Sequence, residues 1–161
     1  MNNVEINKSM RLSEHFSLGE VCKTSHKTAD GNIPSRVAIE NLKNICENWL
    51  EDLRYSNNVL YEEVGSDGAP IIITSGYRSP EVNKLAGGSS TSNHLTGCAV
   101  DIRCIGVEQA LRYANILLDI ADGTKRDFDE LFIERNKQGR YWIHFAVRPK
   151  ENRRKISFLQ T

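Results

Sequence analysis

The sequence predicts an α+β fold in which a small, mainly antiparallel sheet packs against helices within a single domain. Two amphipathic stretches, residues 35–55 and 107–121, carry apolar side chains at helical spacing. A β-branched run at 71–74 indicates a buried strand, and residues 128–134 and 141–147 indicate two more. The Asn-Lys-Gln-Gly turn between the last two strands favours a hairpin, which makes that pair antiparallel.

Local signals describe the segments between these elements. Ser17 followed by Glu20 is the pattern of a capping box, so a short helix is expected to begin there. Residues 23–34 are polar and end at a proline, which predicts a loop. Residues 56–69 are polar and turn-rich and are expected to form a second loop.

The two ends of the chain are assigned to the same domain. The last segment, residues 148–161, is basic and is expected to be a loosely packed tail. Residues 1–34 are expected to be an N-terminal extension that packs on the domain. Because 161 residues suit one domain, we treat 1–161 as a single unit.

Composition narrows the function classes. The chain has 21 basic and 21 acidic residues, so its charge gives no case for nucleic acid or an anionic membrane as partner. No apolar stretch approaches the roughly 20 residues that span a bilayer. The first residues lack the apolar segment of a signal peptide, so we expect synthesis in the cytoplasm. The four cysteines form no Cys-x-x-Cys pair, and we expect their thiols to be reduced. We also expect the protein to be a monomer.

The clearest chemical signal is the pair His94 and Asp101, seven residues apart with Gly97 between them. The glycine lets the chain turn sharply, and residues 98–102 then alternate as a strand. Val100 and Ile102 share one face of this strand, so Asp101 points to the other face. A loop histidine and a strand aspartate could therefore converge on one cation, and nitrogen with carboxylate ligation suits zinc.

A third ligand is needed, because a catalytic zinc usually has three protein ligands and one water. The remaining histidines are His15, His26 and His144. His144 lies in an alternating strand that could lie beside the Asp101 strand, whereas the other two lie in the N-terminal region. On the residues alone, His144 is the best of these three candidates.

A metal hydrolase also needs a general base. If the hairpin turn centres near Gly139, Glu134 lies opposite His144, where it could take a proton from water and pass it to a leaving amine. Glu130 has the same strand parity and is the alternative. Arg78 follows the 71–74 strand and could grip a substrate carboxylate or polarise the scissile carbonyl.

The pattern Ser92-x-His94-x-x-Gly97-x-Ala99-x-Asp101, followed by Trp142-x-His144, resembles the zinc D-alanyl-D-alanine carboxypeptidase family. That family includes D,D-dipeptidases and phage endolysins that cut L-Ala–D-Glu bonds. Segments 75–79 and 128–134 are similar to the phage-type branch. The resemblance covers most of the chain.

This resemblance implies zinc as cofactor, with His94, Asp101 and His144 as ligands. It makes Arg78 a catalytic and substrate-binding residue, and Ser92 a residue that supports the site. We also expect Tyr77 and Trp142 to contact substrate.

The implied substrate is a peptidoglycan stem peptide, cut at either a D-Ala–D-Ala or an L-Ala–D-Glu bond. A phage or prophage lysin, which acts on the cell wall after release, would fit this substrate. Several relatives place the base three residues before the last histidine, where this chain has Tyr141. The base assignment therefore falls to Glu134, and a zinc- or wall-binding module without catalysis is the alternative.

Overall fold

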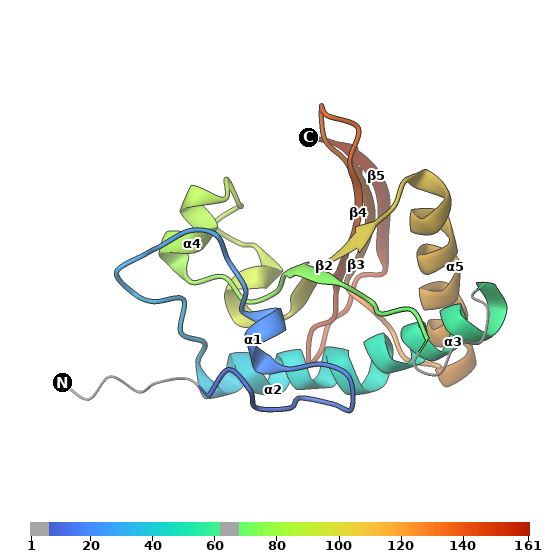
Figure 1. The fold of residues 1–161 in the computed structure, drawn as a ribbon, viewed down its shortest axis with the longest axis horizontal. Helices are drawn as coiled ribbons and strands as arrows, with labels where there is room; N and C mark the ends of the chain where they lie inside the picture. The colour runs from blue at the N-terminus through green and yellow to red at the C-terminus, as the bar shows by residue number, and fades with distance from the viewer. Residues whose placement is uncertain (1–6, 62–67) are drawn as a thin grey trace.

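A computed structural model describes residues 7–61 and 68–161 as one sheet with helices around it (Figure 1). The sheet has five strands in the order β1-β2-β4-β3-β5. The strands are β1 (Ile73–Ser75), β2 (Ala99–Cys104), β3 (Glu130–Arg135), β4 (Tyr141–Ala146) and β5 (Lys155–Gln160). All pairs are antiparallel except β3 and β5, which run parallel. The predicted α+β class is confirmed.

The helices support the sheet from one side and from below. A long rod follows the base of the fold, formed by α2 (Arg36–Ile45), a π-helical turn (Cys46–Leu50) and α3 (Glu51–Tyr61) (Figure 1). The helix α5 (Val107–Thr124) packs beside the strands. The short helices are α1 (Leu18–Val21), α4 (Pro80–Leu85) and the 3-10 turn η2 (Asn93–Thr96).

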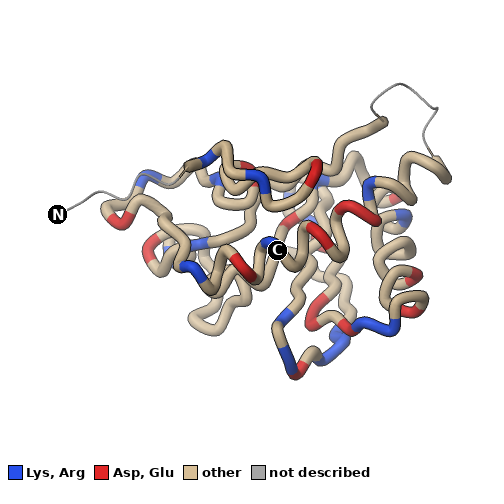
Figure 2. The backbone as a smooth tube through the Cα atoms, turned by 90° about the horizontal axis from the view of Figure 1, so that it is seen from below, with Lys and Arg blue, Asp and Glu red and all other residues tan. Residues whose placement is uncertain are grey.

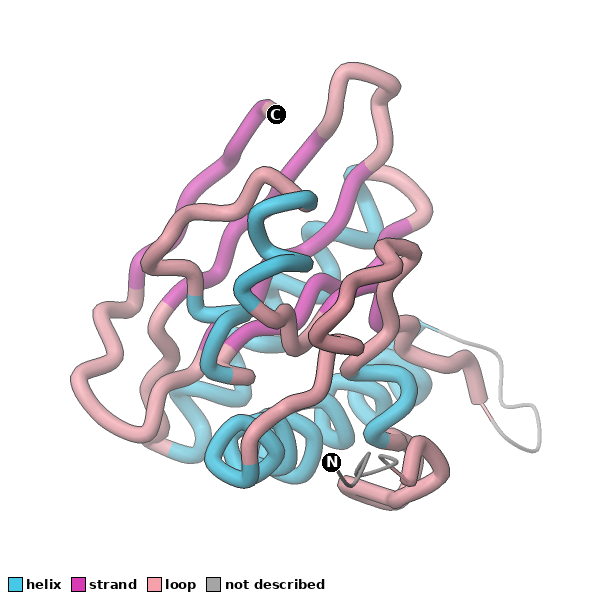
Figure 3. The backbone as a smooth tube through the Cα atoms, turned by 90° about the vertical axis from the view of Figure 1, so that its left-hand side faces the viewer, coloured by secondary structure: helices cyan, strands magenta, loops and turns pink. Residues whose placement is uncertain are grey.

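Strand alternation gives the sheet two different faces. Towards α5 and the helical rod, Ile102 of β2, Leu131 of β3 and Phe145 of β4 are almost fully buried in one apolar core. The opposite face carries polar side chains, among them Asp101, His144 and Glu134. The helix α4 with its flanking loops lies in front of this face (Figure 3). The core therefore fixes the strands from behind and leaves the polar face available for chemistry.

The capping box predicted at the first short helix is confirmed. Ser17 and Glu20 form a complete capping box at the start of α1. Ser35 caps α2, and its side chain accepts a hydrogen bond from the backbone N–H of Ala38. The N-terminal extension contributes Leu12 and Phe16 to the core. All four cysteines are free.

Other boundaries differ from the sequence prediction. The first long helix continues to Tyr61, because Leu53 and Asn57 lie on its buried side and keep it packed beyond residue 55. Of the predicted 56–69 loop, residues 62–67 lie outside the described residues. The strand expected at 71–74 is shorter and later, at Ile73–Ser75. The helix α4 was not predicted, although Ser79 caps it and Pro80 occupies its first turn.

The expectation of a loosely packed tail is wrong. Residues 155–160 form the edge strand β5, in which Lys155 pairs with Glu130 and Gln160 with Arg135. Its sequence alternates only weakly, so the backbone ladder with β3 decides its structure. Within the part of the chain that the structure describes, no helix has the length and apolar character needed to cross a membrane. Basic and acidic residues are interspersed over the fold (Figure 2).

Candidate metal centre and active site

Three potential metal ligands meet on the polar face of the sheet. Asp101 of β2 lies directly across the ladder from His144 of β4, so their side chains share one face. His94 comes from the turn η2, immediately before β2. The three side chains are 3%, 10% and 12% exposed for His94, Asp101 and His144 respectively. Residues that the sequence placed together are therefore together in the fold.

The spacing of the donor atoms suits a metal ion. One imidazole nitrogen from each histidine and one oxygen of Asp101 all lie within 4.8 Å of one another. Asp101 Oδ1 is 3.4 Å from His94 Nε2 and 3.2 Å from His144 Nδ1. Ligands at about 2.1 Å from a tetrahedral zinc are about 3.4 Å apart, so these two distances fit that geometry. Two nitrogens and one carboxylate also leave a fourth position for water or substrate.

Hydrogen bonds at the far side of each ring orient the histidines. His94 Nδ1 lies 2.6 Å from the carbonyl oxygen of Gly76, so this nitrogen carries the proton and donates it. His144 Nε2 lies 3.2 Å from Glu130 Oε1 and donates in the same way. In each ring the nitrogen that faces Asp101 is then left to bind a cation. Such outer partners usually fix the tautomer of a metal-binding histidine.

The turn that carries His94 depends on Gly97. This residue has φ of 71°, a left-handed conformation that favours glycine, and it ends the η2 turn. A Cβ there would also collide with the backbone of Ala38 on α2. Ser92 begins the turn, and its Oγ accepts a hydrogen bond from the backbone N–H of His94 at 3.2 Å. The sharp turn predicted at Gly97 is confirmed.

Arg78 holds the second oxygen of Asp101. Its NH2 atom is 3.1 Å from Asp101 Oδ2, and its Nε donates to Ser75 Oγ at 3.0 Å. Burial alone would raise the pKa of Asp101, but the two histidines beside it outweigh burial and hold the pKa well below its usual range. Asp101 is therefore an anion that one arginine and two imidazoles share.

The base candidate Glu134 pairs with a residue of β4 two positions before the expected one. The hairpin centres on residue 138, so Glu134 pairs with Trp142 and Phe132 pairs with His144. The expectation that Glu134 lies directly opposite His144 is therefore wrong. The strand alternation still places Glu134 on the same face, as a diagonal neighbour of His144, and diagonal neighbours are typically about 7–8 Å apart. Phe132 occupies the position directly opposite His144 and stacks on its ring, with centroids 5.3 Å apart.

The surroundings of Glu134 are suited to proton transfer. Trp142 Nε1 donates a hydrogen bond to Glu134 Oε2 at 2.5 Å. Burial raises the pKa of Glu134 above its usual value, and the negative charge of Asp101 adds to this effect. A carboxylate with a raised pKa binds a proton more readily near neutral pH.

The carboxylate of the alternative base, Glu130, already accepts hydrogen bonds from neighbouring side chains. Its Oε1 accepts hydrogen bonds from His144 Nε2 and, at 2.6 Å, from Asn93 Nδ2. Its Oε2 lies 3.5 Å from Arg153. Burial opposes ionisation of Glu130, but the hydrogen bonds from His144 and Asn93 outweigh it and lower the pKa. These contacts make Glu130 a group that orients His144, which leaves Glu134 as the better base candidate.

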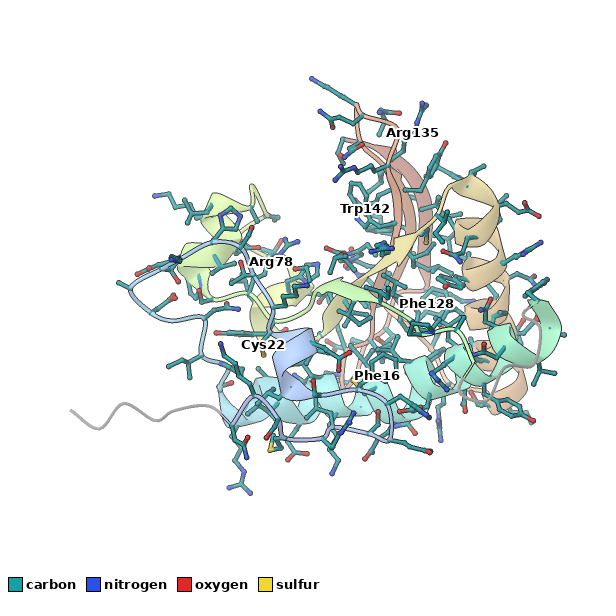
Figure 4. The ribbon with its side chains drawn as sticks, in the orientation of Figure 1. Phe16, Cys22, Arg78, Phe128, Arg135 and Trp142 are labelled. Carbon is teal, nitrogen blue, oxygen red and sulfur yellow. The ribbon has the colours of Figure 1, made fainter. Side chains whose placement is uncertain are left out.

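One cavity of about 770 Å³ contains the centre. It is lined by the expected residues Arg78, Ser92, His94, Asp101, Glu134, Trp142 and His144. Figure 4 shows Arg78 and Trp142 on either side of the open space between α4 and the sheet. Tyr77 does not line this cavity, because its ring is 8% exposed and packs in the apolar core.

Sequence reasoning missed a second layer of polar residues. Asp129 is fully buried and accepts hydrogen bonds from Arg153 and Asn93. Burial would raise the pKa of Asp129, but these partners lower it to about 2. Asn93 immediately precedes His94, and this position beside a ligand was the one available signal. Nothing in the linear pattern indicated that Arg153 of the tail would return to Asp129.

These features define a class of protein, one with an oriented metal-binding centre inside a cavity that also holds a carboxylate base candidate. Comparison with known families then gives the family. The sequence model of peptidase M15 matches residues 14–128, and the chain belongs to that family, which is of the zinc D-Ala-D-Ala carboxypeptidase type. The resemblance seen in the sequence is confirmed, and membership implies a metallopeptidase. No curated protein matches the chain.

The matched segment covers only part of the centre. It contains Arg78, His94 and Asp101 and ends at residue 128, before Glu134 and His144. The assignment of those last two residues therefore depends on the register of β3 and β4 and on the distances given above.

Proposed function

We propose that this chain is a zinc peptidase that hydrolyses a peptide bond in peptidoglycan stem peptides. His94, Asp101 and His144 are the zinc ligands in this proposal, and Glu134 is the general base. The observation that carries it is the donor set with its two oriented imidazoles, placed in one cavity with Glu134. Membership of the peptidase M15 family supports the reaction class.

When bound, zinc would supply a Lewis acid that lowers the pKa of water and polarises a carbonyl. The protein residues move the protons. Glu134 accepts a proton from the attacking water while the water oxygen bonds to the carbonyl carbon. The C–N bond then breaks, and Glu134 donates the same proton to the leaving nitrogen. Its raised pKa suits both halves of this transfer.

Arg78 has a role in binding and in charge stabilisation. Its Nε and NH2 are engaged with Ser75 and Asp101, so the guanidinium is held in one orientation. Its NH1 has no acceptor among the described residues, and the side chain lines the cavity. This edge can donate to the carbonyl oxygen that becomes negative during attack, or to a substrate carboxylate.

A place of action belongs to the same proposal. The similarity of segments 75–79 and 128–134 to the phage-type branch supports a phage or prophage lysin, which acts on the cell wall after release. The monomeric state expected from the sequence stays a prediction.

The test is mass spectrometry of the products from purified muropeptides, with zinc-loaded protein and after chelation. We expect chelation to abolish cleavage. Glu134→Gln should retain zinc and lose at least about 100-fold in rate, because general-base catalysis contributes about 10²- to 10⁴-fold. Glu108→Gln is the matched control, since Glu108 is exposed on α5 and does not line the cavity.

Two results would contradict the proposal in different ways. Full activity of Glu134→Gln would remove Glu134 as the base. Wild-type protein that binds zinc but releases no fragment from any peptidoglycan chemotype would favour the zinc- or wall-binding module. The absence of a carboxylate at Tyr141, where several relatives place their base, is the observation behind that second reading.

A further inference from the structure

A cluster of basic side chains lies on the wall of the cavity that β3 and β5 form. Arg148, Arg153 and Lys155 all line the cavity, and all come from the segment after β4. The mechanism above uses none of them. Since Lys155 pairs with Glu130 across the β3–β5 ladder, this cluster borders the metal centre.

The two arginines are fixed by one buried carboxylate. Arg153 binds Asp129 through two parallel hydrogen bonds, of 2.9 Å from Nε and 2.7 Å from NH2. Arg148 Nε lies 3.1 Å from Asp129 Oδ2 and 3.1 Å from Asn93 Oδ1. Because Asp129 has no solvent-exposed surface, it anchors both guanidinium groups from behind.

The loop that carries the arginines is itself held in a defined shape. Asn152 accepts a hydrogen bond from the backbone N–H of Arg148 and donates one to its carbonyl oxygen. Glu151 and Arg154 have φ of 58° and 50°, a conformation that residues other than glycine seldom adopt. Such backbone strain persists only where surrounding contacts impose it, and it is concentrated at functional sites.

Arg148 keeps most of its hydrogen-bonding capacity unused. A guanidinium has five N–H donors, and Arg148 uses only the one at Nε in contacts with the residues that the structure describes. Its side chain is 33% exposed and lines the cavity. The two terminal nitrogens therefore present a planar fork to whatever enters, which is the geometry that suits a carboxylate.

The position of this fork relative to the metal centre follows from a chain of contacts across the sheet. Arg78 contacts Asp101, Asp101 contacts His144, and His144 contacts Glu130. Glu130 in turn lies 3.5 Å from Arg153. Arg78 follows β1 and Arg153 precedes β5, which are the two edge strands, so the candidate ligands on β2 and β4 lie between these two arginines.

The charges in the cavity also favour an anionic ligand. Four cationic side chains and three carboxylates line it, and Asp129 behind the wall adds a fourth carboxylate. With the imidazoles neutral, as metal binding requires, these charges are balanced, and a bound divalent cation would make the site positive. A substrate that carries a negative charge near its scissile bond would reduce this positive charge.

We propose that Arg148, with Arg153 beside it, binds a free carboxylate of the substrate on the side of the scissile bond away from Arg78. This inference rests on the proposed function and specifies its substrate as an acidic peptide. Arg148 is the direct contact, and Asp129 and Asn93 hold it in place. A stem peptide has two backbone sources of such a group, the α-carboxylate of its γ-linked D-Glu and the carboxylate at its C-terminus.

The test compares three synthetic stem pentapeptides, one with both carboxylates free, one amidated at D-Glu and one amidated at the C-terminus. For wild-type protein, we expect one of the two amides to lower kcat/KM by about 10- to 100-fold, the usual effect of losing a hydrogen bond to a charged group. In Arg148→Gln, the ratio of kcat/KM for the free peptide to kcat/KM for that amide should fall close to one. Arg148→Lys should give an intermediate ratio. Arg112→Gln, which removes a cation on the exposed face of α5, is the control and should keep the wild-type ratio.

A binding measurement keeps the inference separate from the proposed reaction. The affinities of the same peptides for zinc-loaded Glu134→Gln, with and without Arg148→Gln, are measured by calorimetry. The amide that lowers kcat/KM should also bind more weakly than the free peptide when Arg148 is present. In the variant with Arg148→Gln, the two peptides should bind equally. If Arg148→Gln also lowers the melting temperature, the binding measurement is repeated with Arg148→Lys, which keeps the charge.

The outcomes are distinguishable. Absence of cleavage with a retained preference for the free carboxylate would contradict the proposed function and support the arginine site. Cleavage with equal kcat/KM for all three peptides would overturn the arginine site and leave the peptidase intact. An amide effect that persists unchanged in Arg148→Gln would also overturn it, because another residue would then recognise the carboxylate.

Discussion

On β4, Ile143 and Phe145 point into the core shared with α5, whereas Trp142 and His144 point into the cavity. The core side is held by packing between apolar groups, such as the Trp49 and Phe145 rings at 5.1 Å. The cavity side is held by hydrogen bonds among groups that are also largely buried. Apolar packing tolerates exchange of one shape for a similar one, but a buried polar network depends on every partner. Alternate residues of one strand therefore serve different purposes: those that face the core stabilise the fold, and those that face the cavity form the site.

The largest expected effect is on the core face. Phe145→Ala should lower the free energy of unfolding by about 3–5 kcal/mol, because the ring is fully buried and leaves a cavity. Denaturant unfolding with zinc-affinity measurement on the folded protein checks this. We expect zinc binding to survive, since His144 points the other way. A large loss of zinc affinity in the folded variant would show that the two faces are not independent.

Next in size is the orienting contact on the cavity face. Glu130→Ala should weaken zinc binding by about 10- to 100-fold, because His144 Nε2 loses the acceptor that fixes its ring. Glu130→Gln keeps an acceptor oxygen and should lose less. The matched control is Ile133→Val on the same strand, which should cost about 0.5–1.5 kcal/mol of stability and leave zinc affinity unchanged. Equal zinc affinity in wild type and Glu130→Ala would remove the orienting role.

The pH dependence of zinc binding probes the same face. Burial opposes protonation of His144, but hydrogen bonds to Asp101 and Glu130 outweigh it and raise the pKa to about 9 in the metal-free protein. Zinc must displace this proton, so the apparent affinity should rise by about tenfold for each pH unit up to that value. Titration with a competing chelator between pH 6 and 9 measures it.

The same shift affects the stability of the metal-free protein. Because the pKa is raised from 6.5 in the unfolded chain, the protonated ring stabilises the fold fully below pH 6.5. This contribution is lost as the pH rises towards 9. The metal-free melting temperature should therefore fall over that interval, and a His144→Gln variant should show a smaller fall. A flat profile in the wild type would contradict the raised pKa.

The smallest expected effect concerns the contact between Trp142 and the proposed base. Trp142→Phe removes the N–H that donates to Glu134 but keeps an aromatic ring on the cavity wall. The hydrogen bond lowers the pKa of Glu134, so its loss should move the acidic limb of the pH–rate profile to higher pH. We expect a few-fold loss of kcat/KM near neutral pH, which a net gain of about 1 kcal/mol from one hydrogen bond implies. An unchanged acidic limb would mean that Trp142 serves only as part of the wall.

The sequence predicted those parts of the site that local geometry controls. The spacing from His94 to Asp101 contains its own turn at Gly97. The apolar neighbours of Asp101 on β2 and of His144 on β4 face the core, so strand alternation turns both side chains to the opposite face. The capping box at Ser17 and Glu20 was also predicted, because a cap involves only neighbours along the chain. The family resemblance rested on these same local motifs.

Tertiary structure decided what depends on partners distant in the chain. The hairpin register moved Glu134 from His144 to Trp142, because the loop length, and not the strand pattern, sets the pairing. The basic tail became β5 only because β3 offered an open edge. Glu130 and Arg148 gained their positions through Asn93 and Asp129, and no periodicity in the sequence reports such contacts. By itself the sequence determined which residues share the polar face, and the packing of distant segments determined what each of them can do there.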